Sequence, residues 1–147
     1  MVHIQIQRQA RPCLLFSRCE LRHVLQVLGH LFGWRIGDIE VLITSDQGIA
    51  KINREFLHLP GPTNVLSFPQ DMDPEQGLNG SIVLSIHALE REARLYGQEV
   101  REHGLRLLTH SVLHLAGFEH GELMEAMTDS GLEAALGLYA HRQEGNP

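Results

Sequence analysis

Cysteine and long apolar runs are scarce in this sequence. Only Cys13 and Cys19 are present among 147 residues, and two thiols cannot build the disulfide framework of a small secreted domain. None of the apolar runs approaches the roughly 20 residues that a membrane-spanning helix needs. The alternating segment 1–8 does not contain the apolar stretch of a signal peptide. We therefore expect a protein of the reducing cytoplasm.

Lysine is almost absent too, because eleven of the twelve basic residues are arginine, and the formal net charge is −6. A negative net charge argues against general attraction to nucleic acid. The charge is uneven, since residues 1–35 have a balance of +4 and the remainder −10. Arginine suits bidentate contacts with phosphate. The N-terminal segment is therefore either a solvated surface or a local patch that faces RNA.

The length favours a single domain over residues 1–147, and a hydrophobic content of 43% is enough for one core. Strands are predicted over 2–7, 38–44, 65–69 and 81–86, and helices over 17–33, 46–56, 87–96, 98–115 and 122–139. Strands and helices do not alternate strictly. We therefore expect an α+β fold, with a small mixed β-sheet packed with about five helices. The polar tail 142–147 is expected to fray.

Three of the ten histidines fall within residues 110–120. His110 and His114 are four residues apart on a predicted helix, so they share one face. Gly117 stands where a helix can end in a left-handed residue, and such a turn can bring His120 back toward the other two. Three imidazole nitrogens with an open fourth position form the ligand set of a catalytic zinc site. The alternative is a polar helix face beside an unrelated loop histidine, but the spacing favours one Zn²⁺ per chain.

The same spacing occurs in the metzincin class of zinc proteases. These enzymes need a glutamate directly after the first histidine as general base. This chain has Ser111 there, and serine cannot take a proton from zinc-bound water at neutral pH. The ligand set is present without the proteolytic base, which disfavours a metallopeptidase or a related metal hydrolase.

Three blocks of the chain match the pattern of a known family. Segment 110–120 matches the signature His-Gly-x-Leu-His-Leu-x-Gly-Tyr-Asp-His at its three histidines, two leucines and glycine. Segment 63–69 is similar to Thr-Asp-Val-Leu-Ser-Phe-Pro, and segment 80–85, followed by 90–93, is similar to a Gly-Asp-Ile strand and the helix after it. Over roughly residues 40–140 the chain therefore resembles the YbeY-type endoribonucleases, or rRNA maturation factors.

The resemblance implies a single-strand-specific, metal-dependent endoribonuclease. Such an enzyme acts in ribosomal RNA maturation, notably at the 3′ end of the small-subunit RNA, and in ribosome quality control. The implied fold is α+β, with one zinc on the three histidines. Single-stranded RNA, above all ribosomal RNA, is the implied partner, together with ribosomal proteins or a ribosome-associated GTPase and without a membrane. A non-catalytic, zinc-containing factor that binds RNA in ribosome assembly is the alternative.

The chain departs from the family pattern at several positions. Leu57 stands where the family has an arginine, and Arg54, three residues earlier on the same helix face, is the candidate substitute. Asn64 and Ser81 replace aspartates, which removes two carboxylates that could support metal ligands. Glu119 replaces the aspartate before the last histidine and keeps its charge.

These comparisons give a set of candidate site residues. The catalytic candidates are Glu119 as acid or base, Ser67 as a hydrogen-bonding group and Arg54 as a cation for phosphate. The substrate-binding candidates are Asn64, which alternatively caps a turn, and Phe118, which stacks on a base or staples its loop. Zinc would lower the pKa of a bound water toward about 7. Either the resulting hydroxide attacks the phosphate or the RNA 2′-OH does so, and both routes stay open.

Overall fold

The computed structural model describes residues 1–7, 10, 16–70 and 77–144, with side chains only to residue 137 in the last helix. The described part forms four strands and five helices, so the expected α+β fold with a small mixed sheet is confirmed. In chain order they are β1 (Val2–Ile6), α1 (Arg18–Phe32), β2 (Ile36–Thr44), α2 (Asp46–Leu57), β3 (Val65–Pro69), β4 (Leu78–Ser85), α3 (Ile86–Tyr96), α4 (Val100–Leu115) and α5 (Glu122–Glu144).

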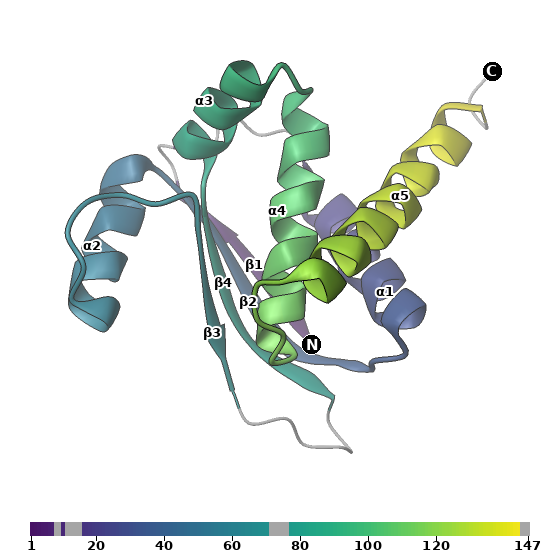
Figure 1. Cartoon of the computed structure of the whole chain (residues 1–147), viewed down its shortest axis with the longest axis horizontal. Helices are drawn as coiled ribbons and strands as arrows, with labels where there is room; N and C mark the ends of the chain where they lie inside the picture. Colours follow the sequence, from purple (N-terminus) through teal and green to yellow (C-terminus); the bar gives the residue numbers. More distant parts are fainter. Residues whose placement is uncertain (8–9, 11–15, 71–76, 145–147) are drawn as a thin grey trace.

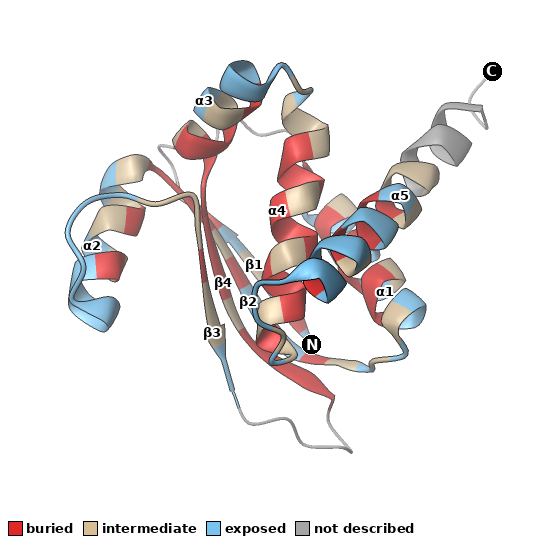
Figure 2. Cartoon of the chain, viewed as in Figure 1, coloured by how far each residue is buried: buried red, intermediate tan, exposed pale blue. Residues whose placement is uncertain are grey.

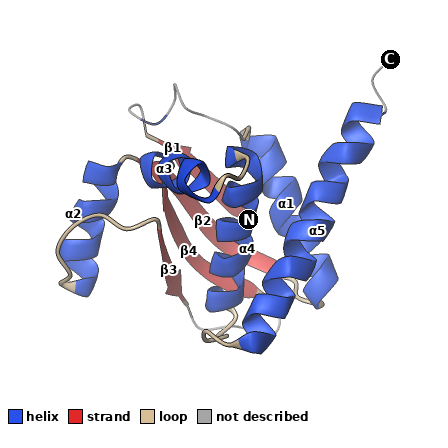
Figure 3. Cartoon of the chain, turned by 45° about the horizontal axis from the view of Figure 1, so that its top comes forward, coloured by secondary structure: helices blue, strands red, loops and turns tan. Residues whose placement is uncertain are grey.

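The four strands form one sheet in the order β1-β2-β4-β3. Strands β1, β2 and β4 are parallel, and β3 pairs with β4 in the antiparallel sense at one edge. Helices α1, α4 and α5 lie on one face, which we call the inner face, and α2 lies on the outer face (Figures 1 and 3). The pairing registers place Ile4, Val41, Ile82 and Ser67 in one row across the inner face.

The main hydrophobic core lies between the inner face and its three helices (Figure 2). Alternate residues of β2, such as Ile39 and Val41, are buried there in one cluster with residues of α1 and α4. A smaller cluster under α2 joins Ile49 to the outer side of β3 and β4. Helix α4 therefore lies directly on the sheet, and its C-terminal half is held in place by burial.

Serine caps start three of the helices. The Ser17 hydroxyl accepts a hydrogen bond from the Glu20 N–H at 3.1 Å, as the sequence predicted. Ser45 and Ser85 do the same for α2 and α3. Each cap satisfies a backbone N–H that has no partner inside the helix, so the start of each helix is fixed.

Three elements extend two or more residues past a predicted end. Strand β2 begins at Ile36 rather than at residue 38. Strand β4 begins at Leu78 rather than at residue 81, because it pairs with β2 on one side and β3 on the other. Those pairings are long-range and leave no local pattern. Helix α5 continues to Glu144, into the segment that was expected to fray, and residues 145–147 lie outside the described part.

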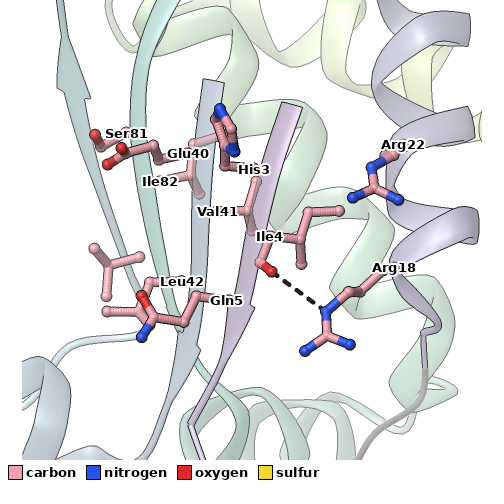
Figure 4. A pocket seen from close by; sticks show the side chains of 11 residues that line it. His3, Ile4, Gln5, Arg18, Arg22, Glu40, Val41, Leu42, Ser81 and Ile82 are labelled. Carbon is pink, nitrogen blue, oxygen red and sulfur yellow. Dashed lines mark hydrogen bonds between the residues drawn. The ribbon is translucent and has the colours of Figure 1, made fainter. Parts of the chain in front are cut away.

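Arginines of α1 cap the free edge of β1. The Arg18 Nε donates to the Ile4 carbonyl at 3.3 Å, and the Arg22 Nε donates to the Val2 carbonyl at 3.5 Å. Both line a cavity of about 430 Å³ that extends over the outer face of the sheet (Figure 4). An open strand edge invites pairing with another chain, and these caps occupy its carbonyls. An RNA-facing role for the N-terminal arginines stays a prediction.

Cys19 is exposed and carries a free thiol. Cys13 lies outside the described residues. Within the described part, each helix is too short or too polar to cross a lipid bilayer.

Gly80 lies where the C-terminal end of α4 meets the sheet. A Cβ at this position would lie 2.6 Å from Leu115 Cδ2 and 2.7 Å from the Phe68 carbonyl oxygen. Both distances are shorter than a Cβ contact in a folded protein, so the side chain must be a hydrogen atom. Glycine thus allows the last turn of α4, which carries His114, to approach β4 closely.

Replacing Gly80 by alanine should therefore lower stability. For Gly80→Ala we expect the free energy of unfolding to fall by about 1–3 kcal/mol, the usual cost of overpacking, as measured by urea denaturation. Gly137→Ala on α5 is the matched control, because a Cβ there meets nothing within 4 Å. The control should be neutral or up to about 1 kcal/mol more stable. Equal stability of Gly80→Ala and wild type would contradict the close approach.

Candidate metal centre

The structure brings the three predicted histidines together at the C-terminal end of α4. Each offers a ring nitrogen, and these nitrogens all lie within 4.8 Å of one another. The Nε2 atoms of His110 and His114 are 3.1 Å apart. The His120 ring centroid lies 5.1 Å from that of His110 and 4.9 Å from that of His114. His110 and His114 are half-buried and His120 is exposed, so the group opens toward solvent.

A turn at Gly117 returns the chain so that His120 faces the helix. Gly117 has φ 92°, and its N–H donates to the His114 carbonyl at 3.0 Å. The Phe118 N–H donates to the Leu113 carbonyl at 3.1 Å. This pair of hydrogen bonds is the Schellman motif, which needs a left-handed residue and favours glycine. The left-handed turn that the sequence predicted is confirmed.

The same turn orients the imidazole of His114. Its Nδ1 lies 3.1 Å from the Phe118 carbonyl oxygen. A carbonyl only accepts hydrogen bonds, so Nδ1 is the donor, and in the neutral form of this ring the lone pair is on Nε2. That lone pair faces the other two rings. A partner of this kind on the far nitrogen fixes the ring of a metal ligand and raises its basicity.

Electrostatics also favour the neutral imidazole of His110. Burial lowers the pKa of His110 below its ordinary value, and the neighbouring His114 and His120 lower it further. Only neutral imidazole has a lone pair for a metal ion. Three ring nitrogens that converge on one point fit a divalent ion with an open coordination position. The residues present could therefore hold such an ion.

A cavity of about 460 Å³ adjoins the histidines. Its opposite wall is the edge strand β3 with the residue before it, and the lining residues are Asn64, Val65, Leu66, Ser67, Pro69 and the three histidines. Ser67 lies on the inner face of β3, which turns it toward α4. Ser67 and Asn64, predicted on sequence blocks far from the histidines, are thus brought to the same cavity.

The side chain of Asn64 is already engaged within the protein. Its Nδ2 donates to Glu92 on α3, at 2.8 Å to Oε1 and 3.3 Å to Oε2. Its Oδ1 accepts from the Val65 N–H at 2.7 Å. Its backbone carbonyl accepts from the Ser85 N–H at 2.9 Å. Asn64 therefore anchors the start of β3, and a contact with substrate stays a prediction.

Three of the candidates do not line this cavity. Arg54 is exposed on α2, which covers the outer face of the sheet. The ring of Phe118 packs against Trp34, with 5.9 Å between the ring centroids. Glu119 is exposed beside His120. Their roles stay predictions, and the imidazoles are the ionisable side chains among the described lining residues.

Ser111 and Ser81, which differ from known metal-site patterns, both lie away from the cavity. Ser111 is fully buried, and its hydroxyl donates to the Leu107 carbonyl at 2.8 Å. It therefore cannot act as a base toward a water in the cavity. Ser81 lies in one row with Glu40 and Phe68 on the outer face. The carboxylate missing at Ser81 would not have faced the histidines.

The sequence analysis missed two partners of the site. The Phe118 carbonyl orients His114, and Glu92 holds Asn64. A backbone carbonyl leaves no signature in a sequence. Glu92 is 28 residues from Asn64, and no pattern of spacing links the two.

Removing one imidazole should abolish tight metal binding. For His120→Ala we expect zinc affinity, measured by competition with a chromophoric chelator, to fall by more than the 10- to 100-fold typical of outer partners of metal ligands. His30→Ala, an exposed histidine on α1, should bind zinc like wild type. Unchanged affinity in His120→Ala would show that the ion binds elsewhere.

Acid should weaken the centre in two ways. Zinc affinity should fall as the pH drops below 7, because protons compete for all three imidazoles. The metal-free protein should also lose stability below about pH 6.5, the ordinary histidine pKa. The lowered pKa of His110 means that the unfolded chain takes up its proton first. Thermal melts of metal-free wild type and His110→Leu between pH 7.5 and 5 would check this, and an identical pH dependence would contradict it.

The fold and the sequence both have known relatives. A solution structure of TM1509 from Thermotoga maritima matches the whole chain and 97% of its own length, with a TM-score of 0.69 at 21% identity, which shows the shared fold. The endoribonuclease YbeY of Nitratidesulfovibrio vulgaris is 45% identical over 67% of this chain and 72% of its own. That of Oleidesulfovibrio alaskensis is 35% identical over 95% of each chain.

The family model described as endoribonuclease YbeY matches residues 16–136. That range includes all three histidines, the turn at Gly117 and the β3 wall of the cavity. The match covers well over half of the chain. With its fold, its histidine centre and its relatives in agreement, the chain belongs to the YbeY endoribonuclease family.

Proposed function

We propose that the protein is a zinc-dependent endoribonuclease that cuts single-stranded RNA in ribosomal RNA maturation and ribosome quality control. The observation that carries the proposal is a three-histidine group open to a cavity of about 460 Å³, in a chain of the YbeY family. Three imidazole nitrogens that converge on one point suit zinc. Its relatives are named endoribonucleases.

A zinc ion held by the three histidines would supply Lewis-acid chemistry toward a phosphodiester near neutral pH. The residues of the chain place the RNA. Ser67, on the cavity wall formed by β3, is the group we assign to hydrogen-bond a phosphate oxygen. The open edge of the cavity admits an extended strand, and a single strand leaves its backbone accessible to such a site.

Other candidates would act at the rim or farther away. Glu119 is exposed next to His120. We assign it as the acid or base that transfers a proton at the entrance of the cavity. Phe118 would stack a base only after its ring leaves Trp34, whose centroid is 5.9 Å away. Arg54 lies on α2, on the opposite face of the sheet from the histidines. We therefore assign it to bind a phosphate of the RNA that is remote from the bond that is cut. Leu57, the last residue of α2, offers no cation.

The proposed setting is the cytoplasm, with ribosomal RNA as the substrate. The net charge of −6 gives the protein little general attraction for RNA. Delivery by ribosomal proteins or by a ribosome-associated GTPase would supply the missing affinity. We therefore propose that such a partner guides the enzyme to its site.

Cleavage of a labelled single-stranded RNA by zinc-loaded protein tests the proposal. His114→Ala, purified in parallel, should lose at least about 100-fold in rate, since catalysis by a bound metal accounts for several kcal/mol. His30→Ala should cut like wild type, and a duplex of the same sequence should stay intact. A substrate with a 2′-deoxyribose at the cut would distinguish attack by the 2′-OH from attack by water.

Two outcomes would contradict the proposal. Equal cleavage by wild type and His114→Ala would identify a contaminating nuclease. No cleavage by folded, zinc-loaded wild type would favour a non-catalytic, zinc-containing factor that binds RNA during ribosome assembly.

A further inference from the structure

We infer that Glu92 is a positioning residue of the enzyme, which acts through Asn64 to hold the β3 wall of the metal cavity. Glu92 lies on α3, and its carboxylate accepts hydrogen bonds from Asn64 Nδ2 at 2.8 and 3.3 Å. It does not line the cavity itself. The inference rests on the proposed function, because it assigns Glu92 to the same site.

The β3 wall needs an anchor because β3 is an edge strand. Two hydrogen bonds at the ends of β3 show which of its residues bond to β4. The Ser85 N–H donates to the Asn64 carbonyl, and the Gln70 N–H donates to the Asn79 carbonyl. The bonding residues of β3 are the even-numbered ones, since bonding alternates along an antiparallel pair. The backbone groups of Val65 and Ser67 therefore point to the free edge. The Val65 N–H is satisfied there by Asn64 Oδ1 at 2.7 Å.

Glu92 determines which way the amide of Asn64 points. A carboxylate only accepts hydrogen bonds, so it draws the NH₂ group toward α3 and leaves Oδ1 for the Val65 N–H. Both ends of the Asn64 side chain are then engaged. Without Glu92 the amide would be free to rotate, and the cap on Val65 would be lost part of the time.

The surroundings of Glu92 fit a structural carboxylate. Its side chain is 20% exposed, and His103 Nε2 of α4 lies 3.7 Å away without a hydrogen bond from either ring nitrogen. The adjacent Arg91 pairs with Asp46, at 2.9 Å. The short hydrogen bond of Glu92 is therefore the one to Asn64. Helices α3 and α4 meet the start of β3 at this carboxylate.

The donor at position 64 is as important as the acceptor at 92. An aspartate at position 64, as in the family pattern, would set two carboxylates against each other with no donor between them. In this chain, Asn64 supplies that donor. Exchanging the two groups, with aspartate at 64 and glutamine at 92, would restore a hydrogen bond in the opposite direction.

The test uses four variants of the full-length, zinc-loaded protein on single-stranded RNA. Glu92→Ala and Asn64→Asp should lower kcat about 10-fold, the lower end of the effect of partners that orient active groups. Glu92→Gln keeps an acceptor and should recover most of the rate. The double variant Asn64→Asp/Glu92→Gln should exceed Asn64→Asp alone. The matched control is Glu133→Ala, at an exposed position of α5.

Two further readouts separate positioning from loss of the fold or of the metal. Zinc content should stay at one per chain in every variant, because the ligands lie on α4 and its turn. Hydrogen exchange of the Val65 amide, followed by NMR, should become faster in Glu92→Ala and Asn64→Asp and stay unchanged in Glu133→Ala. Far-UV circular dichroism identifies any variant that does not fold. If Glu92→Ala does not fold, the comparison of the double variant with Asn64→Asp decides the question.

The outcomes are distinct. Wild-type kcat together with wild-type Val65 exchange in Glu92→Ala would overturn the inference. A double variant no faster than Asn64→Asp would overturn it as well. If wild type cuts no RNA, the proposed function fails, and Val65 exchange alone decides whether Glu92 holds the β3 wall.

Discussion

The contact between α4 and the inner face of the sheet sets the geometry of the rest of the protein. It is built from aliphatic side chains on both sides and closes tightly at Gly80, where Leu115 reaches the backbone of β4. The packing around Gly80 is tight, because a Cβ there would meet both Leu115 and the Phe68 carbonyl. It therefore fixes the height of His110 and His114 relative to β3. The cavity between them is a product of that packing.

Two kinds of structure meet at the metal centre. The three histidines come from one short segment, in which a helix, a glycine turn and a carbonyl from the same turn arrange the imidazoles. The opposite wall comes from an edge strand that relies on Asn64 and α3 for its position. The first kind depends on local bonds. The second depends on the assembled fold.

This difference explains what the sequence could predict. The histidine group and the turn at Gly117 were predictable, because spacing along a helix and a preference for left-handed glycine are local properties. The sheet and helices followed from periodicity, except where pairing with two neighbours lengthened β4. The link from Asn64 to Glu92 could not be read from sequence, since it joins segments that only folding brings together. Nor could the position of Arg54 on the far side of the sheet, because amphipathic periodicity does not say which face of a sheet a helix will cover.

The placement of all three histidines within eleven residues has a consequence for how the protein is assayed. All three histidines are arranged by bonds within their own segment, and β3 supplies none of the nitrogens of the group. A preparation in which β3 is displaced can therefore keep the histidine group and still lack the opposite wall of the cavity. Zinc content therefore reports on the histidine segment alone. It does not show that the rest of the cavity is correctly assembled.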